Sequence, residues 1–115
     1  MTISVKGAVQ VKNEQGRVEY SELLAKDFSV AEHYIRHLKI AAGSIDANLD
    51  LGGVSDITFA LILSDLPVAP KINGALSALP AGNMFVFSGS TGSYITDIKL
   101  SNAAGTDANL RVILG

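Results

Sequence analysis

The sequence predicts an all-β protein, an antiparallel and jelly-roll-like β-sandwich of about nine short strands. Two observations support this fold class. Apolar residues alternate with polar ones through most of the chain, which puts one face of each strand into a core. Turn-forming residues interrupt the alternation at the spacing that is typical of sandwiches. A length of 115 residues and a hydrophobic content of 48% fit one domain, 1–115, with a core of ordinary size.

The N-terminal segment, 1–25, predicts a β-hairpin that acts as an assembly arm or as an edge strand. The loop 13–16 ends on a glycine, which suits the positive φ of a hairpin turn. Apolar residues of the first strand share one face and form the expected assembly edge: Ile3, Val5, Val9 and Val11. Closing the loop between residues 12 and 17 predicts these pairs: Val11 with Val18, Val9 with Tyr20, and Val5 with Leu24.

The segment 30–42 allows two interpretations. Ser29 and Glu32 fit the capping box of a helix, and Gly43 fits a helix C-cap. The run 34–40 is rich in strand-forming residues, however, and the segments around it are strand-like. We therefore favour a strand and keep one short helix around residues 30–42 as the alternative.

The rest of the chain continues the strand pattern. Alternation predicts strands at 45–51, 57–63, 84–87, 94–100 and 109–114. Both faces of 57–63 are apolar, which predicts a central strand that is covered on both sides. The short segment 68–72 lies close to Pro67 and contains Pro70, and we expect it at a sheet edge because proline donates no ladder hydrogen bond.

Composition and motifs indicate a protein that is not an enzyme. Without cysteine, disulfides, thiol catalysis and Cys-ligated metals are excluded, and no nucleophile motif or phosphate-binding loop is present, so we expect no cofactor. The candidate metal ligands are His33 and His37, which are the two histidines of the chain and are four residues apart. We interpret them as polar residues on a solvent-facing side, because two imidazoles without a further ligand cluster do not define a metal site.

Charge and hydropathy exclude further partners. Nine Lys and Arg against eleven Asp and Glu give a formal net charge of −2, and the cations are scattered, so we expect no nucleic acid. The longest apolar run, 59–63, is too short to span a bilayer, and we expect no membrane partner. The N-terminus lacks the basic and apolar regions of a signal peptide, so we expect synthesis in a host cytoplasm.

The second half of the chain resembles small β-sandwich virion proteins of tailed bacteriophages. The segments that carry the resemblance, within 45–115, read IDANLDLGGV, ALILSDLPV, KING, YITDIKLSN and NLRVILG. The resemblance implies a structural protein of the virion, either a capsid decoration or cement protein or a neck, head–tail or tail accessory protein. It implies assembly in many copies, as a homo-oligomer such as a trimer, with the major capsid or tail protein as a further partner. It assigns no catalytic residue.

A carbohydrate-binding or receptor-binding β-sandwich module is the alternative function, because jelly rolls often bind sugars. Such a module needs exposed aromatic rings that stack on sugars. The chain has no Trp, and its three Tyr, at 20, 34 and 94, are expected to point largely inward.

Overall fold

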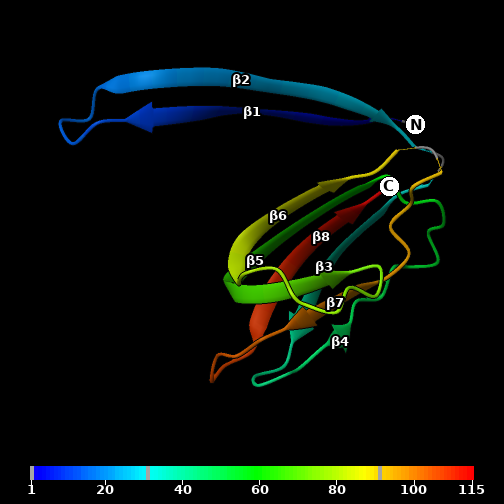
Figure 1. Cartoon of the computed structure of the whole chain (residues 1–115). Coiled ribbons are helices and arrows are strands. Elements are labelled where there is room, and N and C mark those ends of the chain that lie inside the picture. The colour runs from blue at the N-terminus through cyan, green and yellow to red at the C-terminus, as the bar shows by residue number, and fades with distance from the viewer. Residues whose placement is uncertain (1, 31, 91) are drawn as a thin grey trace.

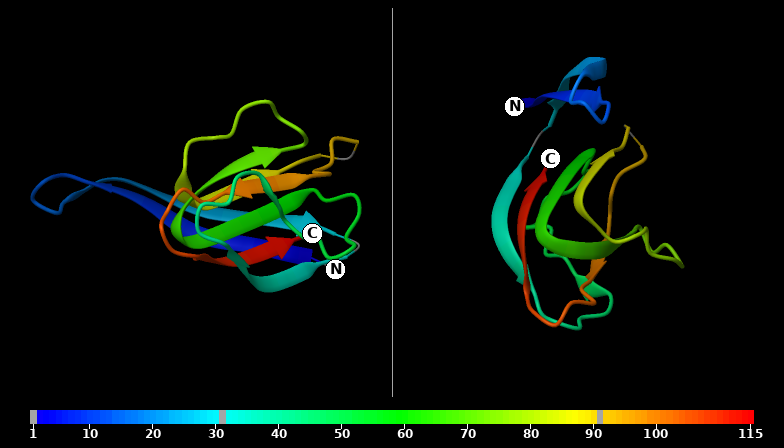
Figure 2. Two further views of the ribbon diagram at one scale, coloured as in Figure 1. Left: turned by 90° about the horizontal axis from the view of Figure 1, so that it is seen from below. Right: turned by 90° about the vertical axis from the view of Figure 1, so that its left-hand side faces the viewer.

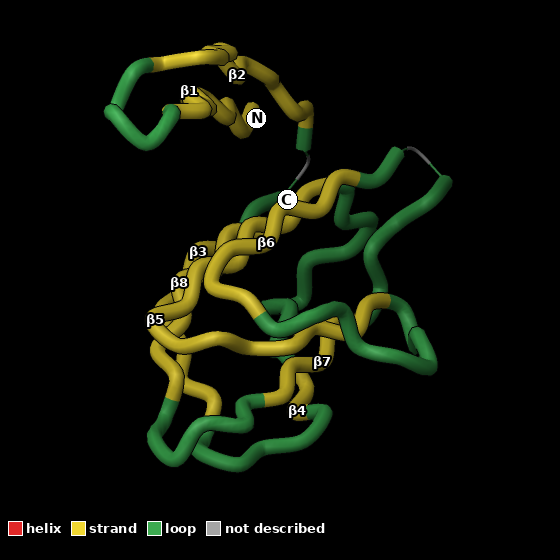
Figure 3. Tube along the Cα trace, turned by 60° about the vertical axis from the view of Figure 1, so that its left-hand side comes forward, coloured by secondary structure: helices red, strands yellow, loops and turns green. Residues whose placement is uncertain are grey.

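The computed structural model describes residues 2–30, 32–90 and 92–115. These residues form eight strands and no helix, and every strand pair is antiparallel (Figures 1 and 3). The all-β, sandwich-like fold class is therefore confirmed, with eight strands in place of nine. The strands, in chain order, are β1 (Thr2–Lys12), β2 (Val18–Ser29), β3 (Tyr34–Ile40), β4 (Ala47–Asn48), β5 (Phe59–Ile72), β6 (Gly82–Ser88), β7 (Ile98–Ser101) and β8 (Ala108–Leu114).

The eight strands form two separate sheets. Strands β1 and β2 pair only with each other and make a hairpin, residues 2–29, that we call the arm. The other six strands form one sheet in the order β3-β8-β5-β7-β4, with β6 paired to β5, and we call this part the body. The sheet of the body curls so that its two ends face each other, while the arm extends beyond it (Figures 1 and 2).

Strand β5 holds the body together because it pairs with three neighbours. Its first half, 59–64, lies between β6 and β8, and its second half, 69–72, pairs with β7. The register with β6 shifts between Leu63 and Val68, where the strand passes from one part of the curled sheet to the other. One continuous strand thus connects both layers around the core.

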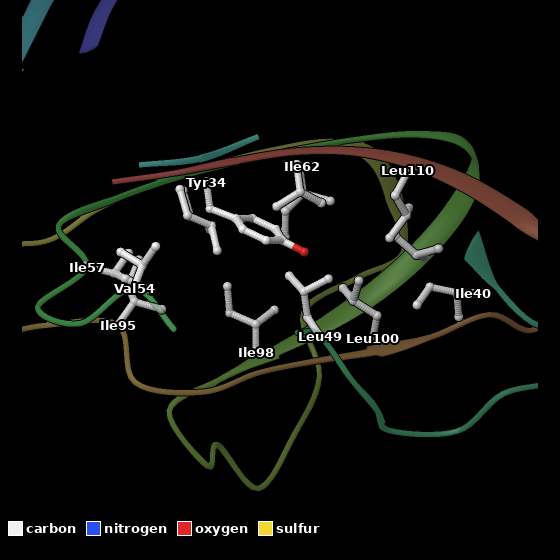
Figure 4. Close-up of a cluster of buried hydrophobic side chains, with 14 of the residues drawn as sticks. Tyr34, Ile40, Leu49, Val54, Ile57, Ile62, Ile95, Ile98, Leu100 and Leu110 are labelled. Carbon is white, nitrogen blue, oxygen red and sulfur yellow. The ribbon is translucent and has the colours of Figure 1, made fainter. Parts of the chain in front are cut away.

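The core lies inside the curl (Figure 4). Alternate residues of β5, β7 and β8 point inward and are fully buried, among them Ile62, Ile98, Leu100, Leu110 and Val112. Tyr34 of β3 lies with its ring between the layers. The period-two alternation of the sequence therefore places the inner face of each strand as expected.

Within the segment 30–42, residues 34–40 form strand β3 and none of the described residues is helical, so the helix alternative is wrong there. Strand β3 pairs with β8 along its whole length, from Tyr34 to Ile40. Residue 31 of this segment lies outside the described residues. The capping pattern at Ser29 and Glu32 is overridden because pairing with β8 buries Tyr34 and Ile40 in the core.

The strand count differs because two predicted strands are one. The segments 57–63 and 68–72 belong to β5, which runs through the expected break. Within 68–72, residues 69–72 have β7 as their strand neighbour on one side, and on the other side the Pro70 carbonyl accepts a hydrogen bond from the N–H of Leu79, a loop residue, at 2.9 Å. The expected edge position of Pro70 therefore agrees with the pairing of the described residues. Proline is tolerated because its ring is buried and the strand needs only its carbonyl at this position.

The arm is longer than predicted, and its register differs by two residues. It reaches Ser29, and Val11 lies opposite Tyr20 where Val18 was expected. The turn closes one residue later than predicted, with Lys12 opposite Val18, and a bulge adds a second residue. Because side chains alternate between the two faces, a total shift of two residues leaves the side chains of β2 from Tyr20 onward on their predicted face.

Candidate functional site

The arm has one apolar face along most of its length. Residues of β1 with odd numbers share a face with residues of β2 with even numbers, because they are paired in register. The apolar members of this arm face are Ile3, Val5, Val9, Val11, Tyr20, Leu24 and Phe28. Its charged members are Glu22 and Lys26. The opposite face carries mainly polar residues, with Leu23 and, beyond the bulge, Val18 opposite Lys12 as its large exposed apolar side chains.

The base of the arm packs on the body through this apolar face. The ring centroids of Phe28 and Phe59 are 4.8 Å apart. The Ile3 side chain lies so close to Gly115 that a Cβ there would be 2.4 Å from the Ile3 Cδ1 atom. Val30 is buried at the same place, and Phe59 is only 1% exposed. These residues form a small cluster outside the main core, and this cluster anchors the arm.

Beyond the base, the apolar face of the arm is about half exposed within the described residues. The exposed fractions are 47% for Val9, 49% for Val11, 53% for Tyr20 and 47% for Leu24. The far end of the hairpin extends past the body in Figure 1 and in the left view of Figure 2. An exposed apolar stripe of this kind is typical of a surface that contacts another molecule.

The body presents a second apolar surface, on the side of its sheet that faces away from the core. Cross-strand pairing aligns outward residues of β3, β8, β5 and β6 into two rows. The first row is Ile35, Ile113, Leu61 and Val86, and the second is His37, Arg111, Leu63 and Met84. We call these eight residues the outer sheet face. Ile35, Met84 and Val86 are 62%, 67% and 54% exposed.

Two hollows lie on this side of the sheet. One, of about 140 Å³, is lined by residues of both rows, including Ile35, Leu61 and Ile113. The other, of about 390 Å³, extends it toward Asp65 and Asn109, and the two share His37, Leu63 and Arg111. The outer sheet face is therefore not flat, and it has room for side chains of a partner.

A polar clamp at the rim of the larger hollow joins β5 to β8. The Asn109 N–H and its Nδ2 atom donate to the two carboxylate oxygens of Asp65, at 2.7 and 2.8 Å. These hydrogen bonds, the side-chain one first, hold the pKa of Asp65 below its ordinary value. The ionised carboxylate is thus the form that stabilises the fold at this rim.

Acid is expected to weaken this clamp. Because the pKa of Asp65 is lower in the folded than in the unfolded chain, its contribution is present above the unfolded value, near 3.8, and is lost as the pH falls through the folded value. Asp65→Asn should therefore reduce the loss of thermal stability between pH 5 and roughly pH 2. Melting temperatures across this range test it, with the exposed Glu32→Gln as control; equal acid sensitivity of Asp65→Asn and the wild type would refute the assignment.

Both apolar surfaces carry charged side chains at a few positions, and those of the arm face include both signs, Glu22 and Lys26. The outer sheet face carries Arg111 opposite His37. The arm face carries Glu22, whose carboxylate accepts a hydrogen bond from the Tyr20 hydroxyl at 2.7 Å; this bond raises the pKa of Tyr20. In the described part of the chain, the one ion pair joins Lys71 to Asp46 at 2.9 Å, so neither Arg111 nor Glu22 takes part in an ion pair there.

The structure places the residues singled out in the sequence at different parts of these surfaces. Ile3 and Val5 are half-buried at the base of the arm, whereas Val9 and Val11 are exposed. All four lie on β1, which pairs only with β2, and their side chains share one face of that two-stranded sheet. Of the expected inward tyrosines, Tyr34 is buried and Tyr94 half-buried, but Tyr20 is exposed on the arm.

The histidines do not form a metal cluster with other ligands. His33 precedes β3 and His37 lies within it, and both are exposed. Within residues 2–30, 32–90 and 92–115, no group of three or more His, Cys, Asp or Glu side chains is arranged to hold a metal ion. Arg111, opposite His37, adds a positive charge that opposes cation binding there.

Sequence reasoning missed the outer sheet face, although a signal for it was present. Strand 57–63 is apolar on both sides, which predicts cover on both. The inner side, with Ala60 and Ile62, is covered by the core. On the outer side only Phe59 is fully buried, while Leu61 and Leu63 stay partly exposed.

The fold and these surfaces define an all-β domain with an apolar-faced hairpin arm. No family model matches the chain, and no curated protein matches its sequence. Among the described residues, no helix is long and apolar enough to cross a membrane.

Proposed function

We propose that this chain is a non-enzymatic structural protein of a bacteriophage virion, a capsid decoration or cement protein or a head–tail accessory protein. It assembles in many copies, as a homo-oligomer such as a trimer, and contacts the major capsid or tail protein. The observation that carries the proposal is the arm, whose apolar face is about half exposed at Val9, Val11 and Leu24. A hairpin that extends from a folded body with such a face is suited to contacts between molecules.

The outer sheet face supports the same proposal. A second exposed apolar surface, with Ile35, Met84 and Val86, gives each copy more than one place for a neighbour. A component that lies between other copies in a shell needs at least two such surfaces, one toward each neighbour. The resemblance of residues 45–115 to phage virion proteins is the reason for proposing that these contacts form in a virion.

The composition of purified particles tests the proposal. Particles of the phage that encodes this chain are banded in a density gradient and their proteins are quantified by mass spectrometry. The chain is expected in the band at many copies per particle, with a fixed ratio to the major capsid protein. A chain that is abundant in the infected lysate and absent from the band would exclude a virion role, and glycan binding by that free protein would favour the carbohydrate-binding or receptor-binding alternative.

A further inference from the structure

We infer that the apolar face of the arm of one copy packs on the outer sheet face of a second copy. The inference deepens the proposed function and rests on it for its biological setting: the function requires many copies, and the inference names the two surfaces that join them. The inference concerns the purified protein alone, so it can be tested separately.

The first support is that the arm face already packs, within one chain, on the part of β5 that leads into the outer sheet face. Phe28 of the arm face packs on Phe59, and the outward residues of β5 continue from Phe59 to Leu61 and Leu63. The contact at the base is therefore the first part of a longer pairing. Each surface continues past this contact with apolar residues that stay partly or largely exposed in the described chain.

The second support is that the arm cannot complete this pairing with its own body. The far end of the hairpin lies beyond the body in Figure 1 and in the left view of Figure 2. The pair of Val11 and Tyr20 lies next to the turn of this hairpin. A two-stranded hairpin without a covering layer is only marginally stable in water. The arm pairs from Thr2 to Ser29 in an unbroken ladder apart from one bulge, so it needs a covering surface that another molecule supplies.

The third support is the match in chemistry. Both surfaces are mainly apolar, and the hollow of about 140 Å³ among Ile35, Leu61 and Ile113 can accept side chains of the size of valine or leucine. Toward its far end the arm face carries the anionic Glu22, whereas its cation, Lys26, lies near the base, with its Nζ atom 5.7 Å from the centroid of the Phe28 ring. The outer sheet face carries the cationic Arg111. Packing of the two faces thus places opposite charges in one interface, where they favour the correct orientation.

A geometric consequence is that the contact is heterologous, because the arm and the outer sheet face are different surfaces. Every copy has one of each, so every copy gives its arm and receives another. A closed assembly, either a reciprocal pair or a ring such as a trimer, leaves no arm uncovered. This closure limits growth into an open filament.

Two neighbouring leucines of the arm give a matched test. Leu24 lies on the apolar face and Leu23 on the opposite one, with exposed fractions of 47% and 82%. Leu24→Asp puts a charge into the proposed interface and is expected to raise the dissociation constant of the oligomer by roughly tenfold or more, whereas Leu23→Asp leaves it within about twofold. Light scattering over a concentration series measures this, and melting curves check that the body stays folded.

Two results of this experiment would overturn the inference. One is a wild-type chain that stays monomeric at every concentration. The other is an equal response of the oligomer to Leu23→Asp and Leu24→Asp, since a charge on the opposite face should not matter. Neither result bears on the virion role, which the protein composition of purified particles tests separately. The two proposals can therefore fail independently.

Chemical cross-linking identifies the surfaces directly. The chain has no cysteine, so engineered thiols are the only reactive ones. A Val9→Cys chain mixed with a differently tagged Val86→Cys chain is expected to give a mixed dimer with a short bis-maleimide. Ile45→Cys, at a position that is 84% exposed outside the outer sheet face, replaces Val86→Cys in the control and should give much less.

A chain that carries both Val9→Cys and Val86→Cys distinguishes contact between two copies from closure of the arm on its own body. Links between chains support the inference. Links within a single chain, or a mixed product no more abundant than with Ile45→Cys, would refute it.

Discussion

Asn102→Ala is expected to lower the free energy of unfolding by about 3 kcal/mol, because the three shorter hydrogen bonds of this side chain to the backbone are lost at roughly 1 kcal/mol each. Asn102 is fully buried. Its Nδ2 atom donates to the carbonyls of Ile40 and Thr106 at 3.1 and 2.9 Å, and its Oδ1 atom accepts from the Ala104 N–H at 3.0 Å. The side chain thus ties the end of β3 to the loop between β7 and β8.

Thermal melting measures this effect, and the shift should be roughly 10–15 °C for a domain of this size. Asn83→Ala is the matched control, since its Nδ2 atom also donates to one carbonyl, that of Ser64, but at an exposed site. The control should cost less than about 1 kcal/mol. Similar melting temperatures for the two variants would mean that burial does not increase the importance of Asn102.

Gly52→Ala is expected to destabilise the body by about 3 kcal/mol or more, through backbone strain and steric conflict together. Gly52 has φ +65°, a value that alanine adopts only at a cost. A Cβ atom at this position would lie 1.9 Å from Cδ2 of Tyr34. The ring of Tyr34 would therefore have to leave its place in the core. Its buried hydroxyl has no hydrogen-bond partner among the described residues, so packing rather than a hydrogen bond fixes the position of the ring.

The next residue isolates the steric part of this effect. Gly53 has φ +74°, but a Cβ atom there meets nothing within 4 Å. Gly53→Ala should therefore cost only the strain, about 1 kcal/mol. Chemical denaturation of both variants gives the difference, and equal losses would show that Tyr34 adjusts without penalty.

The strand pattern of this chain could be predicted because it depends on side chains that alternate between core and solvent. The inner residues of β5 and β8, such as Ile62 and Val112, follow that alternation directly. The continuation of β5 through Pro70 could not be predicted. It depends on the Pro70 carbonyl, which accepts a hydrogen bond from the N–H of Leu79, a residue in a loop. The register of the arm depends on a turn and a bulge, and neither has a clear sequence signature.

The candidate surfaces could be predicted only in part, for a different reason. The apolar side of β1 was visible in the alternation of Val9 and Val11. The outer sheet face combines residues from four strands, and pairing alone brings Ile35 beside Ile113 and Val86 beside Leu61. A single sequence does not reveal which strands pair. The strongest sequence signal for the outer sheet face was therefore the presence of apolar residues on both sides of 57–63.

The long strand β5 also determines how the body can come apart. It shares backbone hydrogen bonds with β6, β7 and β8, so none of these strands can detach without breaking a ladder that β5 supports. The body therefore unfolds as one cooperative unit. The arm shares no ladder with β5 and is held by the small cluster at Phe28 and Phe59, so it forms a separate unit that can open while the body remains intact.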